Sequence, residues 1–191
     1  MNSQSWPPCY RYWPNLSIAT NAVVVRPIRW SDREDIREWR NQQIEVLRQQ
    51  VPISMEQQDL YYSQILAPQM SMTHPSQFLF GIEVDNELIG YGGLTNVSWD
   101  TRQAELSFLV NPKILNTQTY KEVMLAFITV IADFARNQFG LLRIFTETYS
   151  QRTDHIEILE LAGFTQEETL IDRVVVDGKP IDSIIHGLSL V

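Results

Sequence analysis

The clearest periodicity in the chain lies in residues 120–137, where apolar side chains recur at intervals of three and four. The main stripe holds Val123, Phe127, Ile131 and Phe134, and it is broadened by Met124, Ile128 and Ala135. A stripe of this width is typical of an amphipathic helix that lies on a sheet. The pattern therefore predicts a long helix over these residues.

Residues 104–110 follow a period of two instead. Glu105, Ser107 and Leu109 share one face, and the intervening Leu106, Phe108 and Val110 share the other. Alternation of this kind predicts a strand, and the Asn111-Pro112 pair that follows predicts its end.

The other segments alternate between strand and helix patterns. Ser31 or Asp32 is a candidate N-cap for a helix to about residue 41, and Ser54 with Gln57 forms a predicted capping box for a helix to about residue 66. Asp85-Asn86 and Asp177-Gly178 are two-residue turn signals between strands. We expect further strands at 22–28, 78–84, 87–94, 141–146, 165–176 and 181–188, a helix at 153–162, and a loop at 67–77. This order predicts a mixed α/β (α+β) domain in which helices cover both faces of one central sheet.

Residues 1–20 precede this pattern and form an arm before a predicted domain of residues 21–191. The arm is rich in proline and aromatic residues: Trp6, Pro7, Pro8, Tyr10, Tyr12, Trp13 and Pro14. Proline disfavours a regular helix, and exposed aromatic side chains are unfavourable in water. We expect the arm to pack across its own domain or, as the alternative, onto a second subunit of a homodimer.

Composition narrows the function classes. The chain has 191 residues, 44% of them hydrophobic, and a formal net charge of −8. Because no cluster of Lys and Arg stands out, the charge argues against nucleic acid as a partner. The single cysteine, Cys9, excludes a disulfide within the chain. No apolar run reaches the ~18 residues of a membrane span, and the N-terminus has no signal-peptide pattern, so we expect a soluble, cytoplasmic protein.

Three local stretches resemble one enzyme superfamily. Residues 158–164 read ILELAGF before an acidic strand, residues 177–188 read DGKPIDSIIHGL, and Trp39-Arg40-Asn41 precedes Arg48 and Ile53-Ser54. In this order they resemble the GNAT N-acetyltransferases, closest to the subgroup that acts on ribosomal-protein N-termini and amino-sugar nucleotides. The resemblance covers about residues 22–190. It implies a twisted, mostly antiparallel sheet, acetyl-CoA as acyl donor, and a small primary amine as substrate.

The resemblance also implies catalytic positions. The pantetheine arm of acetyl-CoA would lie between the strands at 105–110 and 142–146, with the backbone amides near Leu109 and Val110 facing the thioester. Glu105 occupies the place where several relatives carry a general base, and its alternative interpretation is a salt-bridged strand carboxylate. Asp100, Glu83 and the hydroxyl of Tyr149 are the substitutes. Tyr149 is also the candidate donor of a proton to the leaving thiolate.

The phosphate-binding loop departs from the family pattern. The equivalent stretch is Leu115, Asn116, Thr117, Gln118, Thr119 and Tyr120, in which Gln118 and Tyr120 replace small residues. Glycine is used there because the backbone approaches phosphate closely. The hydroxyl and amide side chains of the loop are possible compensating donors, and an ordinary polar loop before a helix is the alternative. Arg152 and Leu159 stand where relatives have an asparagine and a tyrosine, and Arg152 is a candidate for a CoA phosphate.

We expect the acceptor to be bound by Arg40, Asn41, Arg48 and Trp99. Guanidinium groups bind diphosphate in a bidentate manner, and an indole can stack on a base or sugar. The alternatives are arginines that are solvated or paired with Glu38 or Glu45, and a tryptophan in the core or at its rim. His74, His155 and His186 lack partners at metal-ligand spacing, so we expect no metal. The sequence therefore leaves two hypotheses, an acetyl-CoA-dependent N-acetyltransferase or a GNAT-fold binding module that has lost acetyl-CoA.

Overall fold

A computed structural model describes residues 6–11, 17–20, 22–115 and 117–191. Its centre is an eight-stranded sheet with the order β1-β2-β3-β4-β5-β6-β8-β7. The strands are β1 (Ile18–Ala19), β2 (Val24–Pro27), β3 (Phe78–Val84), β4 (Glu87–Ser98), β5 (Gln103–Val110), β6 (Arg143–Tyr149), β7 (Thr165–Val176) and β8 (Lys179–Ser189). Neighbouring strands run antiparallel except β5 and β6, which are parallel. The predicted mixed α/β fold with a mostly antiparallel sheet is confirmed.

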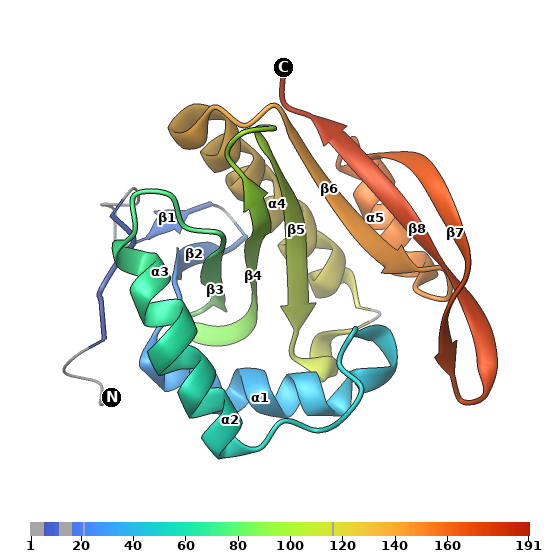
Figure 1. Ribbon diagram of the computed structural model, residues 1–191, viewed down its shortest axis with the longest axis horizontal. Helices are drawn as coiled ribbons and strands as arrows, with labels where there is room; N and C mark the ends of the chain where they lie inside the picture. Colours follow the sequence, from blue (N-terminus) through green and yellow to red (C-terminus); the bar gives the residue numbers. More distant parts are fainter. Residues whose placement is uncertain (1–5, 12–16, 21, 116) are drawn as a thin grey trace.

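Helices cover both faces of this sheet (Figure 1). The helices are α1 (Arg33–Gln42), α2 (Met55–Leu60), the π-helical turn η4 (Tyr61–Leu66), α3 (Ala67–Ser71), α4 (Gln118–Phe139) and α5 (Thr153–Leu161). Short 3-10 turns are η2 (Trp30–Asp32), η3 (Ile44–Val46) and η5 (Pro112–Ile114). Helices α1 to α3 lie on one face, whereas α4 and α5 lie on the other. Each face therefore has its own apolar core.

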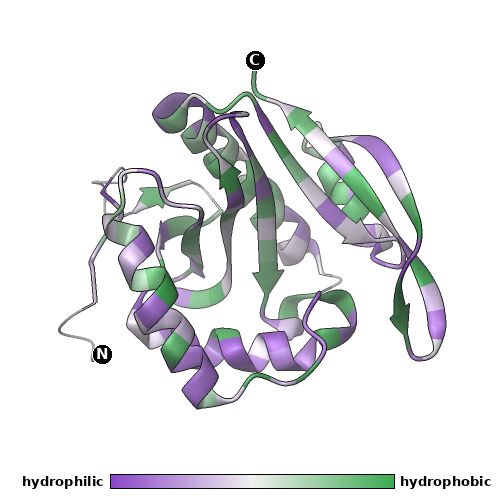
Figure 2. Ribbon diagram, in the orientation of Figure 1, coloured by the Kyte–Doolittle hydropathy of each residue, from purple (hydrophilic) through white to green (hydrophobic). Residues whose placement is uncertain are grey.

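The larger core lies between α4 and the sheet. Val123, Phe127, Ile131 and Phe134 are at most 5% exposed, as the helical stripe predicted. They pack with Phe78 and Phe80 of β3 and Phe108 of β5. Figure 2 shows hydrophobic residues concentrated along the central strands, whereas α1 carries a mostly hydrophilic surface.

The segment after Leu66 differs from the prediction. Ser54 accepts a hydrogen bond from the Gln57 backbone and Gln57 returns one, so the predicted capping box is confirmed. The helix then continues through η4 and α3 to Ser71, where a loop was expected. Pro68 lies in the first turn of α3, where its missing N–H costs little. Burial of Ala67 and Met70, at 4% and 1% exposed, favours the helical continuation.

The described part of the N-terminal arm packs on its own domain. The Trp6 indole donates to the Ile28 carbonyl at 3.0 Å, and the backbone of Arg11 donates to the Met70 carbonyl at 3.0 Å. The Tyr10 ring is 1% exposed and lies between the core and β3. Tyr12, Trp13 and Pro14 lie outside the described residues. Residues 6–11 thus pack across their own domain, as the first of the two interpretations of the arm predicted. The homodimer stays a prediction.

Within the described part of the chain, no helix combines the length and apolar character needed to cross a membrane.

Candidate functional site

The strands β5 and β6 separate in the middle of the sheet. Their pairing covers only the three residue pairs from Gln103–Arg143 to Glu105–Phe145. Beyond these pairs β5 continues to Val110, while β6 continues to Tyr149 along β8. Figure 1 shows the two strands diverging. A cavity of about 220 Å³ lies in this opening, lined by Ser107 and Phe108 on one side and Thr146 and Tyr149 on the other, among others.

An ion-paired acidic cluster lies at the start of the opening. Arg48 Nη2 lies 2.6 Å from Glu105 Oε1 and 2.9 Å from Glu147 Oε2. Asn96 Nδ2 donates to Glu105 Oε2 at 2.7 Å. The Glu105 and Glu147 side chains are only 11% and 9% exposed, whereas that of Arg48 is 53% exposed. A half-exposed arginine thus covers two buried carboxylates.

Each carboxylate is supported from the sheet. Asn96 adopts a left-handed backbone conformation (φ 49°) at the irregular end of the β4–β5 pairing, which directs its amide to Glu105. Burial opposes ionisation of Glu147, but hydrogen bonds from Ser183 at 2.7 Å and Arg173 at 3.1 Å outweigh it and lower the pKa of Glu147. Glu147 was not identified from the sequence, and its place on β6 opposite Arg48 requires the tertiary structure.

The two predicted catalytic side chains line the same cavity. Glu105 comes from β5 and Tyr149 from the end of β6. The Tyr149 hydroxyl donates to the Leu47 carbonyl at 3.2 Å. Burial raises the pKa of Tyr149, so its hydroxyl keeps its proton at neutral pH. The substitutes lie elsewhere, since Glu83 pairs with Arg26 at 2.6 Å and Asp100 lies in the β4–β5 turn.

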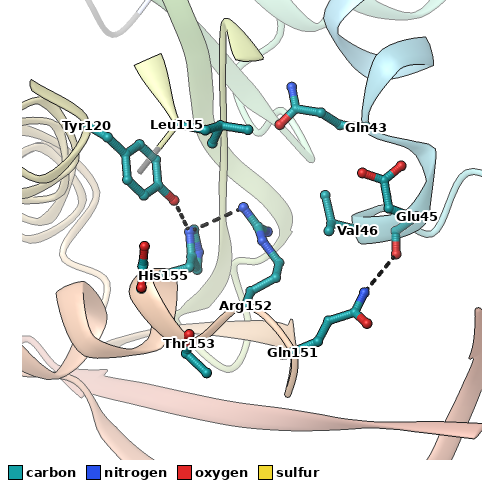
Figure 3. A pocket seen from close by; sticks show the side chains of 10 residues that line it. Gln43, Glu45, Val46, Leu115, Tyr120, Gln151, Arg152, Thr153 and His155 are labelled. Carbon is teal, nitrogen blue, oxygen red and sulfur yellow. Dashed lines mark hydrogen bonds between the residues drawn. The ribbon is translucent and has the colours of Figure 1, made fainter. Parts of the chain in front are cut away.

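A second cavity of about 350 Å³ adjoins the first at the N-terminal ends of α4 and α5. Figure 3 shows its lining, in which the Tyr120 hydroxyl points to His155 and Arg152 approaches from the other side. Tyr120 Oη lies 2.7 Å from His155 Nδ1, and Arg152 Nη2 lies 3.3 Å from the same nitrogen. Burial, followed by the charge of Arg152, holds the pKa of His155 well below its usual value. From the sequence His155 was considered as a metal ligand, and its position in the first turn of a helix beside Arg152 was the available signal for this contact.

The predicted phosphate loop is organised as an ordinary helix cap. Thr117 Oγ accepts from the Tyr120 backbone at 3.2 Å and donates to the Ile114 carbonyl at 2.6 Å. The Gln118 side chain donates to Glu122 at 2.9 Å, and Thr119 is exposed. Asn116 lies outside the described residues. Leu115, Tyr120 and Arg152 line the second cavity together, so these predicted positions do meet there.

These two cavities fit parts of acetyl-CoA unequally. The strand edges beside the first cavity suit the amide-bearing pantetheine arm, which pairs with backbone as an added strand does. Arg152 supplies positive charge in the second cavity, where a phosphate would lie. The buried Tyr120 ring and the capped α4 N-terminus, however, occupy the place where the family resemblance leads us to expect small residues beside the phosphates. The arm therefore fits better than the phosphates do.

The expected contact of the backbone amides near Leu109 and Val110 with the thioester stays a prediction, since β6 pairs with β5 only as far as Glu105. The Leu109 and Val110 side chains are 3% and 1% exposed and pack into the cores on opposite faces of the sheet. The Val110 carbonyl accepts from Gln43 Nε2 at 2.9 Å. The described β5 residues that line the first cavity are Glu105 to Phe108. Burial of the Leu109 and Val110 side chains leaves the prediction for their backbone amides open.

The predicted acceptor residues are divided among three places. Arg40 lines a third cavity of about 480 Å³ under α1 and also the first cavity. Asn41 exchanges hydrogen bonds with the Ile53 backbone at 2.8 and 2.9 Å, so it positions the loop after Gln49. Arg48 binds Glu105 and Glu147, not the neighbouring Glu45 that the alternative named. The Arg48 guanidinium is therefore already ion-paired and is not free to bind a diphosphate.

Trp99 is not brought to these cavities. Its indole donates to the Pro75 carbonyl at 3.0 Å, and its ring packs edge-on against Phe139 at the C-terminal end of α4. Trp99 is partly buried against the larger core, which agrees with its alternative interpretation as a core or rim residue. Among the described residues there is also no group of three or more His, Cys, Asp or Glu side chains placed to bind a metal ion.

Comparison with solved structures identifies similar folds. Spermidine N-acetyltransferase from Vibrio cholerae, solved in complex with CoA and spermine, gives a TM-score of 0.77 at 15% identity, over 90% of this chain and 97% of that chain. Spermidine/spermine N-acetyltransferase SpeG from the same organism, solved in complex with manganese ions, gives 0.72 at 16% identity, over 88% and 93%. A dodecameric structure of spermidine N-acetyltransferase from Vibrio cholerae in an intermediate state gives 0.73 at 17% identity, over 90% and 95%. No curated protein matches the chain.

The sequence itself matches the model of the acetyltransferase (GNAT) domain family over residues 25–185. The match spans every strand from β3 to β7, including the opening between β5 and β6. Sequence and fold lead to the same assignment, and this chain belongs to the GNAT acetyltransferase-domain family.

Proposed function

We propose that this protein transfers an acetyl group from acetyl-CoA to a small primary amine. The observation that carries the proposal is the opening between β5 and β6, which places Glu105 and Tyr149 on one cavity. GNAT acetyltransferases use acetyl-CoA, which supplies the acetyl group as a thioester. The residues of this chain would then position the amine, remove its proton and protonate the sulfur.

Glu105 accepts the proton that the ammonium group of the substrate must lose before its nitrogen can attack the carbonyl carbon. As the C–N bond forms and the C–S bond breaks, the nitrogen loses a second proton to solvent, and negative charge is left on the sulfur. Tyr149 donates its hydroxyl proton there, and its raised pKa keeps that proton available. The proton gained by Glu105 and the one lost by Tyr149 balance through solvent after product release.

The Arg48 guanidinium must move away from Glu105 before the Glu105 carboxylate can accept a proton from the substrate. Both Glu105 oxygens accept hydrogen bonds, from Arg48 at 2.6 and 3.3 Å and from Asn96 at 2.7 Å. A substrate ammonium group therefore competes with the Arg48 guanidinium for the same carboxylate. The 53% exposure of the Arg48 side chain allows it to move into solvent.

An amino-sugar nucleotide, the more specific acceptor considered from the sequence, finds little support. Its diphosphate needs free guanidinium groups, and Arg48 is bound to two carboxylates. Trp99, the expected platform for a base or sugar, packs elsewhere. The broader class of small primary amines is the better proposal.

Calorimetric titration with acetyl-CoA tests the donor, with desulfo-CoA and ATP as comparisons. We expect micromolar binding that survives loss of the sulfur and requires the pantetheine arm. ATP lacks the arm and should bind at least about tenfold more weakly, because the strand edges fit the arm better than the second cavity fits phosphate.

The Glu105→Gln variant tests the base. We expect kcat/KM to fall by about 10² or more at neutral pH, because general base catalysis contributes that much. Glu167→Gln is the matched control, since it removes another arginine-paired carboxylate from the sheet, on β7 beside Arg143. An unchanged rate in Glu105→Gln would remove Glu105 from the mechanism.

A second candidate function rests on the capped α4 N-terminus and the buried Tyr120 ring. Both features favour a GNAT-fold binding module that no longer takes acetyl-CoA. Absence of calorimetric heat up to millimolar acetyl-CoA would establish this alternative over the enzyme.

A further inference from the structure

The third cavity holds an arginine with neutral partners. Arg40 Nη1 donates to the Tyr91 hydroxyl at 2.7 Å, and Arg40 Nε donates to Gln49 Oε1 at 3.0 Å. No carboxylate among the described residues forms an ion pair with Arg40. A partly buried guanidinium normally has a carboxylate or phosphate partner, because its desolvation is otherwise uncompensated. Arg40 thus has the capacity to bind an anion from a ligand.

The rest of the lining of this cavity is uncharged and combines an apolar wall with polar side chains, namely Gln49, Gln50, Gln57, Gln58, Thr95 and Ser107. The cavity volume of about 480 Å³ lies within the roughly 300–1,000 Å³ typical of small-molecule sites. Its walls include the aromatic rings of Tyr61, Tyr62 and Tyr91 and the aliphatic side chains of Ile28, Ile36 and Leu79. None of the described residues that line it is acidic, and Arg40 is its one charged member. Such a lining suits an apolar group and opposes a chain carrying several ammonium groups.

The third cavity continues into the first. Arg40, Thr95 and Ser107 line both, and Glu105 lies in the first. Thr95 pairs directly with Glu105 across β4 and β5. A ligand that spans the junction would therefore meet a carboxylate, a guanidinium and an apolar wall.

We propose, on the basis of the acetyltransferase function above, that the acceptor is an α-amino acid with a large apolar side chain. Its amino group lies at Glu105 after displacing Arg48, its carboxylate binds Arg40, and its side chain fills the third cavity. The reaction class is N-acetylation of the free amino acid. A polyamine, the substrate named for the solved neighbours, would bring further positive charges against Arg40 and the apolar wall.

Calorimetry with three amines tests this inference: L-phenylalanine, phenethylamine and spermidine, each added to the protein alone and to the protein with desulfo-CoA. Phenylalanine and phenethylamine share the ring and the amine and differ by the carboxylate. We expect phenylalanine to bind at least about tenfold more tightly than phenethylamine, because the carboxylate adds a charge-assisted hydrogen bond to Arg40. Spermidine should bind more weakly than either.

Two variants connect the preference to Arg40. Arg40→Gln should bring the affinity for phenylalanine to within about twofold of that for phenethylamine, whereas Arg40→Lys should keep part of the difference. Arg37→Gln is the matched control, since it removes another arginine of α1 that lines none of the three cavities. It should preserve the preference for phenylalanine. Circular dichroism confirms that each variant is folded.

The outcomes separate this inference from the function on which it rests. Three results would overturn the inference. Spermidine could bind more tightly than phenylalanine, or phenylalanine could fail to bind. The preference for phenylalanine over phenethylamine could also be equal in the wild type and in Arg40→Gln. Acetylation of spermidine without binding of phenylalanine would overturn the inference while leaving the acetyltransferase function intact. Arg40-dependent binding of phenylalanine without acetyl transfer would support the inferred ligand and refute the transferase.

Discussion

The Tyr10 hydroxyl completes the hydrogen bonding of β3 from outside the sheet. It accepts from the Leu79 backbone N–H at 2.7 Å and donates to the Leu79 carbonyl at 3.1 Å. Strand β2 ends its pairing at Pro27–Phe80, one residue before Leu79. The hydroxyl therefore takes the place of the next backbone partner. Tyr10→Phe removes this partner and keeps the ring.

The loss of stability expected for Tyr10→Phe follows from the hydrogen bonds that Leu79 keeps in the variant. The Leu79 carbonyl keeps the hydrogen bond from the Ile28 backbone at 3.1 Å. Its N–H would be left buried and unpaired, which costs about 1–3 kcal/mol. For a chain of this size, that loss lowers Tm by about 2–12 °C. Tyr10→Ala would also leave a cavity, because the ring is 1% exposed, and should cost about 3–5 kcal/mol.

Urea denaturation and thermal unfolding of the purified variants measure these losses. Tyr61→Phe is the matched control, since its hydroxyl donates at 2.9 Å to the Gln77 side chain, which can reorient. We expect that control to lose less than about 1 kcal/mol. Equal stability of Tyr10→Phe and the wild type would refute the reasoning, because the Leu79 N–H would then have another partner.

Three further predictions concern stability. Arg26→Met should lower the free energy of unfolding, measured by urea denaturation, by about 3–5 kcal/mol, because Arg26 is 2% exposed and binds both Asp32 and Glu83 at 2.6 Å. Adding Asp32→Asn to this variant should recover part of the lost stability. Gly93→Ala should lower the free energy of unfolding by more than about 4 kcal/mol, because the φ of Gly93 is +147° and an added Cβ would lie 1.9 Å from the Phe78 carbonyl oxygen. A loss of stability well below this value would contradict the geometry. Because the pKa of His155 is lowered in the folded state, its contribution to stability is complete above about pH 6.5 and declines as the pH falls, with a slope of up to about 1.4 kcal/mol per pH unit. His155→Gln should reduce that slope, and an unchanged pH profile would show that His155 is not responsible.

Local signals in the sequence predicted local structure well. Asp85 and Asn86 adopt φ values of 51° and 65°, as a two-residue hairpin turn requires. The stripe of α4 and the alternation along β5 likewise gave the correct faces, because each period is a property of a single element. The prediction for Ala67–Ser71 was wrong because tertiary burial of Met70 overrode the local proline signal.

The site was predicted less completely, since it depends on contacts between distant segments. Glu105 and Tyr149 were identified, but Glu147 and Arg48 meet them only because β6 lies beside β5 and the segment after η3 reaches over both. The replacement of small residues by Tyr120 was visible in the sequence. Its hydrogen bond to His155, 35 residues away, was not. Pattern and spacing specify elements, whereas the pairing of side chains across elements requires coordinates.

The short β5–β6 pairing divides the sheet mechanically. Strands β4 and β5 share seven residue pairs and β6 and β8 share seven, but β5 and β6 share three. The sheet therefore consists of two well-paired parts, β1–β5 and β6–β8, which only three residue pairs join. A rotation of one part relative to the other would widen or narrow the first cavity, while the hydrogen bonds within each part stay intact. Among the strand-paired amides of the central strands, hydrogen exchange should accordingly be fastest at Ile144 and Phe145, where few bonds must break for the two parts of the sheet to separate.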